Sequence, residues 1–431
     1  MIYKSLNKKS KPAKFEEAVV RGIAPDRGLY FPEKIHRLPA SFFNDIETKT
    51  IPEIAFQAIA PFLEGSIPEN ELKKIITETL DFDFPIISIN NQIATLELFQ
   101  GPTLAFKDVG ARFMARCLGY FNQNNTTQKV TVLVATSGDT GGAVAHGFLG
   151  VPGIEVVILY PKGKVSKVQE QQLTTLGQNI TALEVDGVFD DCQDMVKTAF
   201  LDEEITKQKQ LTSANSINIA RWLPQMFYYF IAYKKLKKLN KPLVISVPSG
   251  NFGNICAGLM AREIGLPIDH FVASTNINDV VPDYLKTGIY KPIKSTPTIS
   301  NAMDVGDPSN FIRILKIFGD DFENLKQTLS GYRFTDNQTR KALKEIHQIS
   351  GYVADPHGAV GYLGLKEYLK DHPGKYGIFL ETAHPVKFLD TVEETLDIKV
   401  EIPNRLKETL TKTKDSIEIK NYEGLKSFLL S

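Results

Sequence analysis

The sequence around Lys107 predicts a lowered pKa for its amine. Apolar spacing predicts a helix over residues 105–118, and Thr103 is a capping type just ahead of it. Lys107 falls in the first turn, between Phe106 and Val109, where the helix dipole and apolar neighbours disfavour a cation. A neutral lysine amine is a nucleophile, typically used for a Schiff base. Taken alone, the segment is more typical of a lysine whose stem packs while its ammonium reaches water.

A glycine-containing turn offers a site for a phosphate group. The run Ser249-Gly-Asn-Phe-Gly-Asn254 joins an apolar strand over 242–248 to a helix over 255–264. Gly250 and Gly253 let several backbone N–H groups converge at the start of that helix, which is typical of a phosphate cradle. The run lacks the Lys-Ser/Thr ending of a P-loop, so it does not indicate a magnesium nucleotide. An ordinary tight strand-to-helix turn explains the run equally well.

Two further loops gather polar groups near predicted strands. Ser137-Gly-Asp-Thr-Gly-Gly142 supplies hydroxyls, a carboxylate and turned N–H groups, which suit a carboxylate or a ring hydroxyl. Ser213-Ala-Asn-Ser-Ile-Asn218 precedes a helix that begins near Arg221, whose guanidinium is suited to clamp a phosphate. Each loop, read in isolation, is also explained as a capped turn that bonds internally.

A last polar segment, Thr382-Ala-His-Pro385, ends the strand expected over 376–381. Open α/β sheets hold ligands at this edge, so Thr382 or His384 is a candidate ligand, with ordinary capping as the alternative. His357 lies in a turn into a helix and is interpreted as structural.

These signals are individually modest but fit one group. A cofactor with both an aldehyde and a phosphate would meet the lysine and the glycine turn. Pyridoxal phosphate is such a cofactor, an electron sink held by a lysine Schiff base.

The elements that must position these residues alternate between strands and helices. Buried-strand runs cover 130–135, 154–160, 181–185, 271–274 and 376–381, with helical spacing between most of them. This alternation predicts an α/β fold with a parallel sheet and right-handed crossovers.

The remaining segments suggest three units. Helical spacing over 15–21, 51–63 and 69–80 predicts a mainly helical N-terminal domain. The predicted domains are residues 1–91, a catalytic α/β region over 92–400 with subdomains of about 100–240 and 241–390, and a C-terminal extension over 401–431.

Four longer segments are interpreted more coarsely. Residues 220–239 read as one long helix, 276–307 as a long loop, and 311–349 as helical with a break near Gly331. The charged tail after Val400 is expected to be peripheral.

Composition excludes several classes of protein. Fifty basic and fifty acidic residues cancel, so nothing favours a nucleic-acid or membrane partner. The cysteines, Cys117, Cys192 and Cys256, lie apart in apolar contexts and suit reduced, buried thiols better than disulfides or metal ligands. The sequence shows neither a signal peptide nor a membrane-spanning run, and it predicts a cytoplasmic protein with no metal.

The motifs, in this order, resemble the threonine synthase family, within the fold-type II (tryptophan-synthase-β-like) pyridoxal-phosphate enzymes. The resemblance runs nearly end to end and has two less typical spots, Gly358 where many relatives carry Thr and Val386 where Ala is frequent. The matching segments are Ala24-Pro-Asp-Arg-Gly-Leu-Tyr-Phe-Pro32, Gly101-Pro-Thr-Leu-Ala-Phe-Lys-Asp108, Thr136-Ser-Gly-Asp-Thr-Gly141, Ser213-Ala-Asn-Ser-Ile-Asn218, Ser249-Gly-Asn-Phe-Gly-Asn254 and Thr382-Ala-His-Pro385.

The resemblance implies two open, twisted, mostly parallel sheets with flanking helices, and a role for each site residue. Lys107 would form the Schiff base, and Thr382 would face the pyridine nitrogen. The cofactor phosphate would be held by Gly250, Asn251, Phe252, Gly253 and Asn254. The substrate would be held by Ser137, Asp139 and Thr140 at its carboxylate and by Ser213, Asn215 and Arg221 at its phosphate.

The implied reaction converts O-phospho-L-homoserine and water to L-threonine and phosphate by γ-elimination and β-addition of water. A related phospho-lyase and a hydroxyamino-acid dehydratase are the alternative enzymes, and a non-enzymatic binder of a phosphorylated metabolite is an alternative of another class. The expected protein is a monomer or a homodimer.

Overall fold

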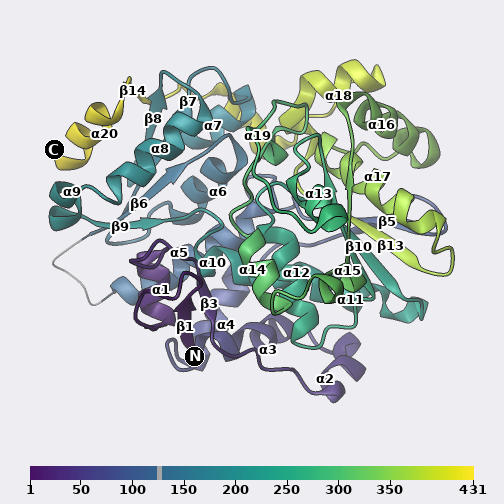
Figure 1. The fold of residues 1–431 in the computed structure, drawn as a ribbon. Helices are drawn as coiled ribbons and strands as arrows, with labels where there is room; N and C mark the ends of the chain where they lie inside the picture. The colour runs from purple at the N-terminus through teal and green to yellow at the C-terminus, as the bar shows by residue number, and fades with distance from the viewer. Residues whose placement is uncertain (124–128) are drawn as a thin grey trace.

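The computed structural model describes residues 1–123 and 129–431, and it contains two large sheets flanked by helices (Figure 1). The first has five strands in the order β14-β8-β7-β6-β9, and every neighbouring pair is parallel. Its bounds are β6 Val130–Ala135, β7 Ile154–Pro161, β8 Ile180–Val185, β9 Gln210–Ser213 and β14 Ile417–Ile419. The long apolar runs of β6 to β8 fit strands covered on both faces.

The second sheet has six strands in the order β12-β11-β10-β13-β5-β4. Its pairs are parallel except for β4 against β5. The bounds are β4 Ile86–Ser88, β5 Ile93–Glu97, β10 Leu243–Pro248, β11 His270–Thr275, β12 Leu329–Arg333 and β13 Tyr376–Glu381. The predicted fold class is confirmed, because the mostly parallel strands form two open sheets.

Residues before β4 combine helices with a small antiparallel sheet in the order β2-β1-β3 (purple in Figure 1). The strands are β1 Ile2–Ser5, β2 Ala13–Lys14 and β3 Tyr30–Pro32, and the helices are α1 Phe15–Arg21, α2 Ala40–Asn44, α3 Ile51–Leu63 and α4 Glu69–Thr79. The Thr50 hydroxyl and the Glu53 carboxylate form a capping box that starts α3. The helices expected over 15–21, 51–63 and 69–80 are therefore present.

The helices that flank the two sheets follow the strands along the chain. Those up to the second sheet are α5 Lys107–Asn122, α6 Asp139–Phe148, α7 Lys167–Thr174, α8 Phe189–Ala199, α9 Glu203–Gln208, α10 Ile219–Trp222 and α11 Met226–Leu236. The later ones are α12 Gly253–Glu263, α13 Val280–Thr287, α14 Phe311–Ile317, α15 Phe322–Thr328, α16 Asp336–Ser350, α17 Pro356–Lys370, α18 Leu389–Leu396, α19 Asn404–Thr411 and α20 Tyr422–Leu430.

The single helix expected over 220–239 is wrong. The chain forms α10, a 3₁₀ turn η2 over Leu223–Gln225, α11 and a second turn η3 over Lys237–Leu239. Pro224 lies within η2 and has no N–H for a helical hydrogen bond, so the helix divides there.

Three other coarse interpretations also need correction. The expected loop over 276–307 contains α13, and the expected helical segment over 311–349 contains strand β12. Gly331 belongs to β12, where an added Cβ would lie 2.9 Å from the Cα of Pro282 on α13. The tail after Val400 is less peripheral than expected, because β14 pairs with β8 and α20 packs beside α8 and α9 (Figure 1). Short strands and helices such as these carry too few residues to show a clear period.

Candidate active site

Lys107 opens α5, as predicted, but Thr103 does not cap the helix in the expected way. The residue before the helix is Phe106, and its side chain makes no capping hydrogen bond in the described structure. Thr103 instead donates its hydroxyl to the buried Asp108 carboxylate at 2.6 Å, and its backbone N–H donates to the same group at 2.9 Å. The Asp108 carboxylate thus organises the turn that precedes the helix and complements the helix dipole.

The Lys107 amine has a lowered pKa. Burial lowers this pKa to about 8, and the positive charges of Arg221 and Lys387 act in the same direction. The negative charge of Asp139 opposes them. The amine lies 5.7 Å from the centre of the Phe106 ring. At pH 7 about a tenth of such an amine is unprotonated, far more than for an ordinary lysine, and able to act as a nucleophile or base.

The segment before Lys107 pairs with the segment after β13. Phe106 N–H donates to the Thr382 carbonyl at 2.8 Å, and His384 N–H donates to the Leu104 carbonyl at 3.1 Å. An antiparallel bridge joins Ala105 to Ala383 between these bonds. The two motifs are therefore held together by backbone pairing at the carboxyl end of a central strand.

The glycine turn after β10 has the tight shape that a phosphate cradle needs. Phe252 adopts a left-handed conformation with φ 58°, and α12 begins at the next residue. A Cβ on Gly250 would lie 2.6 Å from the carbonyl oxygen of Ala302, so only glycine fits without a backbone shift. Asn254 donates its side-chain amide to the Pro248 carbonyl at 2.8 Å and closes the turn. Backbone N–H groups at the start of a helix such as α12 are suited to bind an anion.

A second turn of this kind follows β6. Gly138 has φ 144°, and α6 begins at Asp139. The hydroxyl oxygen of Thr136 accepts hydrogen bonds from the N–H groups of Gly138 at 3.0 Å and Gly141 at 2.8 Å. Ser137 lies just before α6 and Thr140 in its first turn, and both are partly buried.

The loop after β9 lies against both turns. Asn215 donates its amide to the carbonyl oxygen of Ala135, at the end of β6, at 3.2 Å. Ser216 accepts a hydrogen bond from the side-chain amide of Asn251 at 2.8 Å. The Ser213 hydroxyl donates to the Asn215 side chain at 3.2 Å. Loops from both sheets thus converge at the carboxyl ends of their strands, where α/β proteins bind ligands.

Comparison with known proteins shows the family of the chain. Residues 88–380 match the family described as pyridoxal-phosphate dependent enzyme, residues 2–80 match threonine synthase N terminus, and residues 358–429 match threonine synthase, C-terminal. The threonine synthase of Buchnera aphidicola subsp. Baizongia pistaciae is 45% identical over 429 residues, which cover 99% of each chain. The chain belongs to the threonine synthase family.

Solved structures agree with this assignment. The Escherichia coli threonine synthase structure has a TM-score of 0.94 and 39% identity, and the match covers 100% of this chain and 99% of that one. A PLP-bound threonine synthase from Brucella melitensis has a TM-score of 0.92 and 32% identity, with 100% and 98% covered. The cofactor of this threonine synthase family member is therefore pyridoxal phosphate, and the protein is a lyase of amino-acid biosynthesis.

The residues present fit that cofactor. Lys107 supplies an amine with a lowered pKa, and the turn at 250–254 leads into the start of α12, where backbone N–H groups are suited to receive a phosphate. Among the described residues, no group of three or more His, Cys, Asp and Glu could hold a metal ion. Within the same part of the chain, no helix is long and apolar enough to cross a membrane.

Arg221 is more enclosed than a surface phosphate clamp would be. Its side chain is 3% exposed, and one terminal nitrogen donates to the carbonyl oxygen of Ala214. Its Nε has no hydrogen-bond partner among the described residues. Burial lowers the pKa of Arg221 to about 10. The unpartnered nitrogen is compatible with a ligand contact, and the predicted role of Arg221 stays a prediction.

His357 makes the contacts expected of a structural histidine. Its Nδ1 lies 2.6 Å from the Asp355 carboxylate, and its Nε2 accepts a hydrogen bond from the Ala302 N–H at 3.1 Å. Ala302 in turn backs Gly250, so His357 supports the glycine turn from behind. Gly358 is also explained, because a Cβ there would overlap the buried carboxylate of Glu381. Burial and the nearby Asp355 raise the pKa of Glu381.

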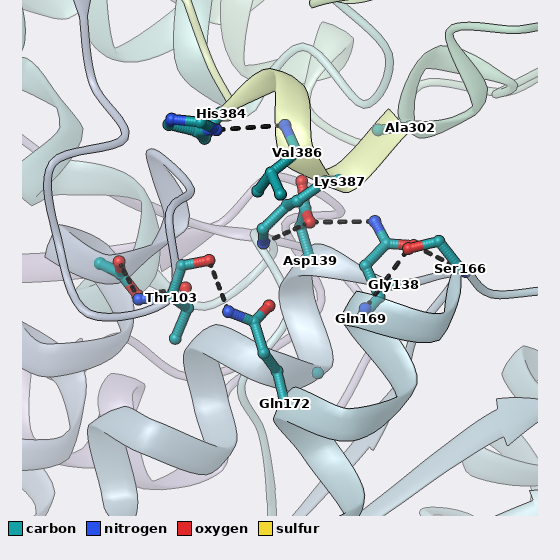
Figure 2. Close-up of polar contacts among 12 residues, drawn as sticks. Thr103, Gly138, Asp139, Ser166, Gln169, Gln172, Ala302, His384, Val386 and Lys387 are labelled. Carbon is teal, nitrogen blue, oxygen red and sulfur yellow. Dashed lines mark hydrogen bonds and ion pairs between the residues drawn. The ribbon is translucent and has the colours of Figure 1, made fainter. Parts of the chain in front are cut away.

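The sequence analysis missed Lys387. This lysine is 1% exposed overall, and its ammonium contacts the Asp139 carboxylate at 2.7 Å (Figure 2). Its position two residues after the motif Thr382-Ala-His-Pro385 was the available signal. That signal was weak, because most lysines are exposed to solvent and the sequence alone does not show that this one is buried.

Proposed function

We propose that the protein converts O-phospho-L-homoserine and water to L-threonine and phosphate, using pyridoxal phosphate at Lys107. One observation supports this proposal: the segment of Lys107, whose pKa is lowered to about 8, pairs with Thr382 after β13, and β13 lies parallel to β10, which leads into the glycine turn at 250–254. Bound pyridoxal phosphate supplies an aldehyde that joins reversibly to amines and a ring that withdraws electrons from the neighbouring carbons.

The chain itself holds the cofactor through three features. Lys107 supplies the covalent attachment, and backbone N–H groups from Gly250 to Asn254 receive the phosphate. The Thr382 hydroxyl, just after β13, would face the pyridine nitrogen. A hydroxyl at this position leaves the ring less electron-withdrawing than a carboxylate partner would.

Two loops receive the substrate. Ser137, Asp139 and Thr140 bind its carboxylate at the start of α6. The Asp139 side chain is already paired with Lys387, so Asp139 contributes its backbone N–H, which lies at the positive end of the helix. The hydroxyl and amide of Ser213 and Asn215 and the guanidinium of Arg221 receive the substrate phosphate.

Lys107 then moves the protons. With the substrate held by the cofactor, the free Lys107 amine would carry one proton at a time: it would take the Cα proton and release it before it takes a Cβ proton. Of these two protons, one would end on the departing phosphate and the other on Cγ. The oxygen of water would bond to Cβ, and a proton of that water would return to Cα. One lysine can serve these transfers because the carbons are adjacent and lie on one face.

Product identification tests this proposal against its enzymatic rivals. The purified protein is incubated with O-phospho-L-homoserine and followed by proton and phosphorus NMR. Threonine and phosphate in equal amounts support the proposal. Release of 2-oxobutyrate with phosphate would instead identify a phospho-lyase. Turnover of threonine or serine in place of the phosphorylated substrate would identify a hydroxyamino-acid dehydratase.

Chemical reduction tests the non-enzymatic alternative. We expect a yellow protein whose colour is lost with borohydride, leaving a cofactor-sized mass on the peptide that contains Lys107. A colourless protein that binds phosphorylated metabolites without turnover would identify a binder.

We also infer the domain boundaries, the cellular location and the oligomeric state of the protein. The division into domains at 1–91, 92–400 and 401–431, a cytoplasmic location, and a monomer or homodimer are parts of this proposal. Limited proteolysis should cut first near these boundaries. Light scattering should give the mass of one or two chains.

A further inference from the structure

Lys387 is a buried cation, which is an unusual position for a lysine. It lies in the 3₁₀ turn η5, Pro385–Phe388, and its side chain is 0% exposed. Its ammonium pairs with the Asp139 carboxylate at 2.7 Å, and the Asp139 side chain is 5% exposed. Burying an ammonium is costly unless a partner compensates its charge, and the Asp139 carboxylate is that partner.

The pair, drawn in Figure 2, joins segments that follow the two sheets, and both of its charges act on the Lys107 amine. Lys387 follows β13 of the six-stranded sheet, and Asp139 follows β6 of the five-stranded sheet. Gln169 of α7 donates its amide to the same Asp139 oxygen at 3.0 Å. Gln169 is itself fixed, because its side-chain oxygen accepts the Ser166 N–H at 3.2 Å. The Asp139 carboxylate is therefore held in place by donors from two elements.

The same turn is anchored next to Lys107. His384, at the start of η5, donates its N–H to the Leu104 carbonyl, three residues before the reactive lysine. Val386 packs with Leu104 and Val168 in one buried apolar cluster. A shift in the position of η5 would therefore disturb both the contact with Asp139 and the segment before Lys107.

The charged groups near Lys107 show how the pair affects protonation of the Lys107 amine. The charged groups that act on the Lys107 amine are Asp139 on α6, Arg221 on α10 and Lys387 on η5. The titratable groups that lie within electrostatic reach of the Lys387 ammonium are Lys107, Asp108, Asp139, His146 and His384. Asp139 favours the protonated form of Lys107, whereas Arg221 and Lys387 favour the neutral form.

We propose that Lys387 is a positioning residue that fixes Asp139 at the start of α6 and offsets its negative charge beside Lys107. The inference rests on the role of Lys107 given under Proposed function. Without Lys387, the Asp139 carboxylate would be buried and uncompensated, and it would draw a proton onto the Lys107 amine. Without Asp139, the Lys387 ammonium would repel that proton more strongly.

The test measures the protonation of Lys107 directly in the full-length, cofactor-free protein. Pulse labelling with acetic anhydride over a pH series, followed by peptide mass spectrometry, gives the midpoint at which Lys107 becomes reactive. Labelling of the exposed Lys238 in the same samples corrects for reagent reactivity. The variants are Lys387→Met, Asp139→Asn, the double variant, Lys387→Arg and, as a matched control, Lys414→Met. Lys414 is also paired with carboxylates, at 2.7 and 2.8 Å, but it is not among the charges acting on Lys107.

Opposite shifts are the expected signature. Relative to a wild-type midpoint near the pKa of about 8, Lys387→Met should raise the midpoint and Asp139→Asn should lower it, each by about 1 pH unit. The double variant should return toward the wild-type value, and Lys387→Arg and Lys414→Met should stay near it. Shifts in the same direction for the two single variants, or none in either, would overturn the inference.

Two further points keep the result interpretable. If Lys387→Met does not fold, the comparison of Asp139→Asn with the double variant still gives the sign of the Lys387 effect: the midpoint must rise when Lys387 is removed, and a fall or no change would overturn the inference. The labelling needs neither cofactor nor substrate, so its outcome is independent of the NMR test of product identity. A wild-type protein that makes no threonine would refute the proposed function while leaving the charge pairing measurable.

Discussion

The proposed chemistry depends mainly on one side chain, Lys107, and the variant Lys107→Ala tests it most simply. The variant loses both the covalent attachment and the base, so kcat should fall by several orders of magnitude, roughly 10³-fold or more. The side chain is only partly buried, so circular dichroism and thermal unfolding should stay close to wild type. Lys238→Ala, an exposed lysine, serves as the control. Near-normal turnover in Lys107→Ala would refute the assignment.

His270 supplies a prediction about pH and stability at the same scale. Burial lowers its pKa to about 4, from 6.5, and its Nε2 lies 2.8 Å from the Ser330 hydroxyl. In the unfolded chain, His270 becomes protonated near pH 6.5. In the folded protein, it becomes protonated only near pH 4. His270 therefore makes the protein less stable as pH falls through this window, by up to about 3 kcal/mol.

The measurement compares urea unfolding of wild type and His270→Gln at several pH values between 7 and 4. The difference in unfolding free energy should change with pH in favour of the variant as the pH falls. A constant difference across the series would show that His270 titrates normally in the folded state.

At the scale of elements, the glycine turn between β10 and α12 is held by the backbone of the loop behind it. In Gly250→Ala the new Cβ would lie 2.6 Å from the Ala302 carbonyl oxygen and 2.8 Å from the Met303 Cα. Both contacts are backbone, so the turn must move, and cofactor affinity should fall about 10-fold or more. Spectroscopic titration with pyridoxal phosphate measures this. Gly374→Ala, where a Cβ would meet no described atom within 4 Å, should bind normally.

Elements with a strong period or clear end signals could be predicted from the sequence. The strands β6 and β13 and the helices α1 and α3 were expected at or near their observed bounds. The short elements were not, because β12 has five residues and α10 has four, too few to distinguish strand, helix and loop. Pro224 was a visible breaker that should have divided the helix expected over 220–239.

The site shows the same division between local and long-range information. Lys107 and the turn at 250–254 could be singled out because their local sequence predicts a helix start and a strand-to-helix turn, and the structure has both; their roles stay predictions. Lys387 was not recognisable, because its significance arises from a contact with Asp139, 248 positions away in the chain. Neither the burial of Arg221 nor the overlap that excludes a Cβ at Gly358 can be derived without the packed structure.

At the scale of the whole molecule, Arg313 connects segments that are distant in the sequence. Its buried guanidinium donates to the Tyr30 carbonyl at 3.0 Å and the Ile217 carbonyl at 2.6 Å. It also lies 4.4 Å from the centre of the Trp222 ring. These contacts link the N-terminal strand β3, the loop after β9 and α14. The loop that is proposed to bind the substrate phosphate is thus fixed from behind by a cation shared with the N-terminal segment.

Arg313→Ala should therefore weaken the molecule as a whole. Removing the guanidinium leaves several buried carbonyl oxygens without donors. The free energy of unfolding, measured in urea, should therefore be about 3 kcal/mol lower than that of wild type. Arg333→Ala removes an arginine whose side chain is 52% exposed and should change stability little. Equal stability of the two variants would show that the Arg313 contacts are not important for joining these segments.

The most direct test of the account is a crystal structure of the protein purified with its cofactor. We expect continuous electron density from Lys107 Nζ to the cofactor ring, with the cofactor phosphate on the backbone N–H groups of residues 250–254 and the ring nitrogen beside Thr382. Density that joins the cofactor to a different lysine, or a phosphate placed away from that turn, would contradict the account.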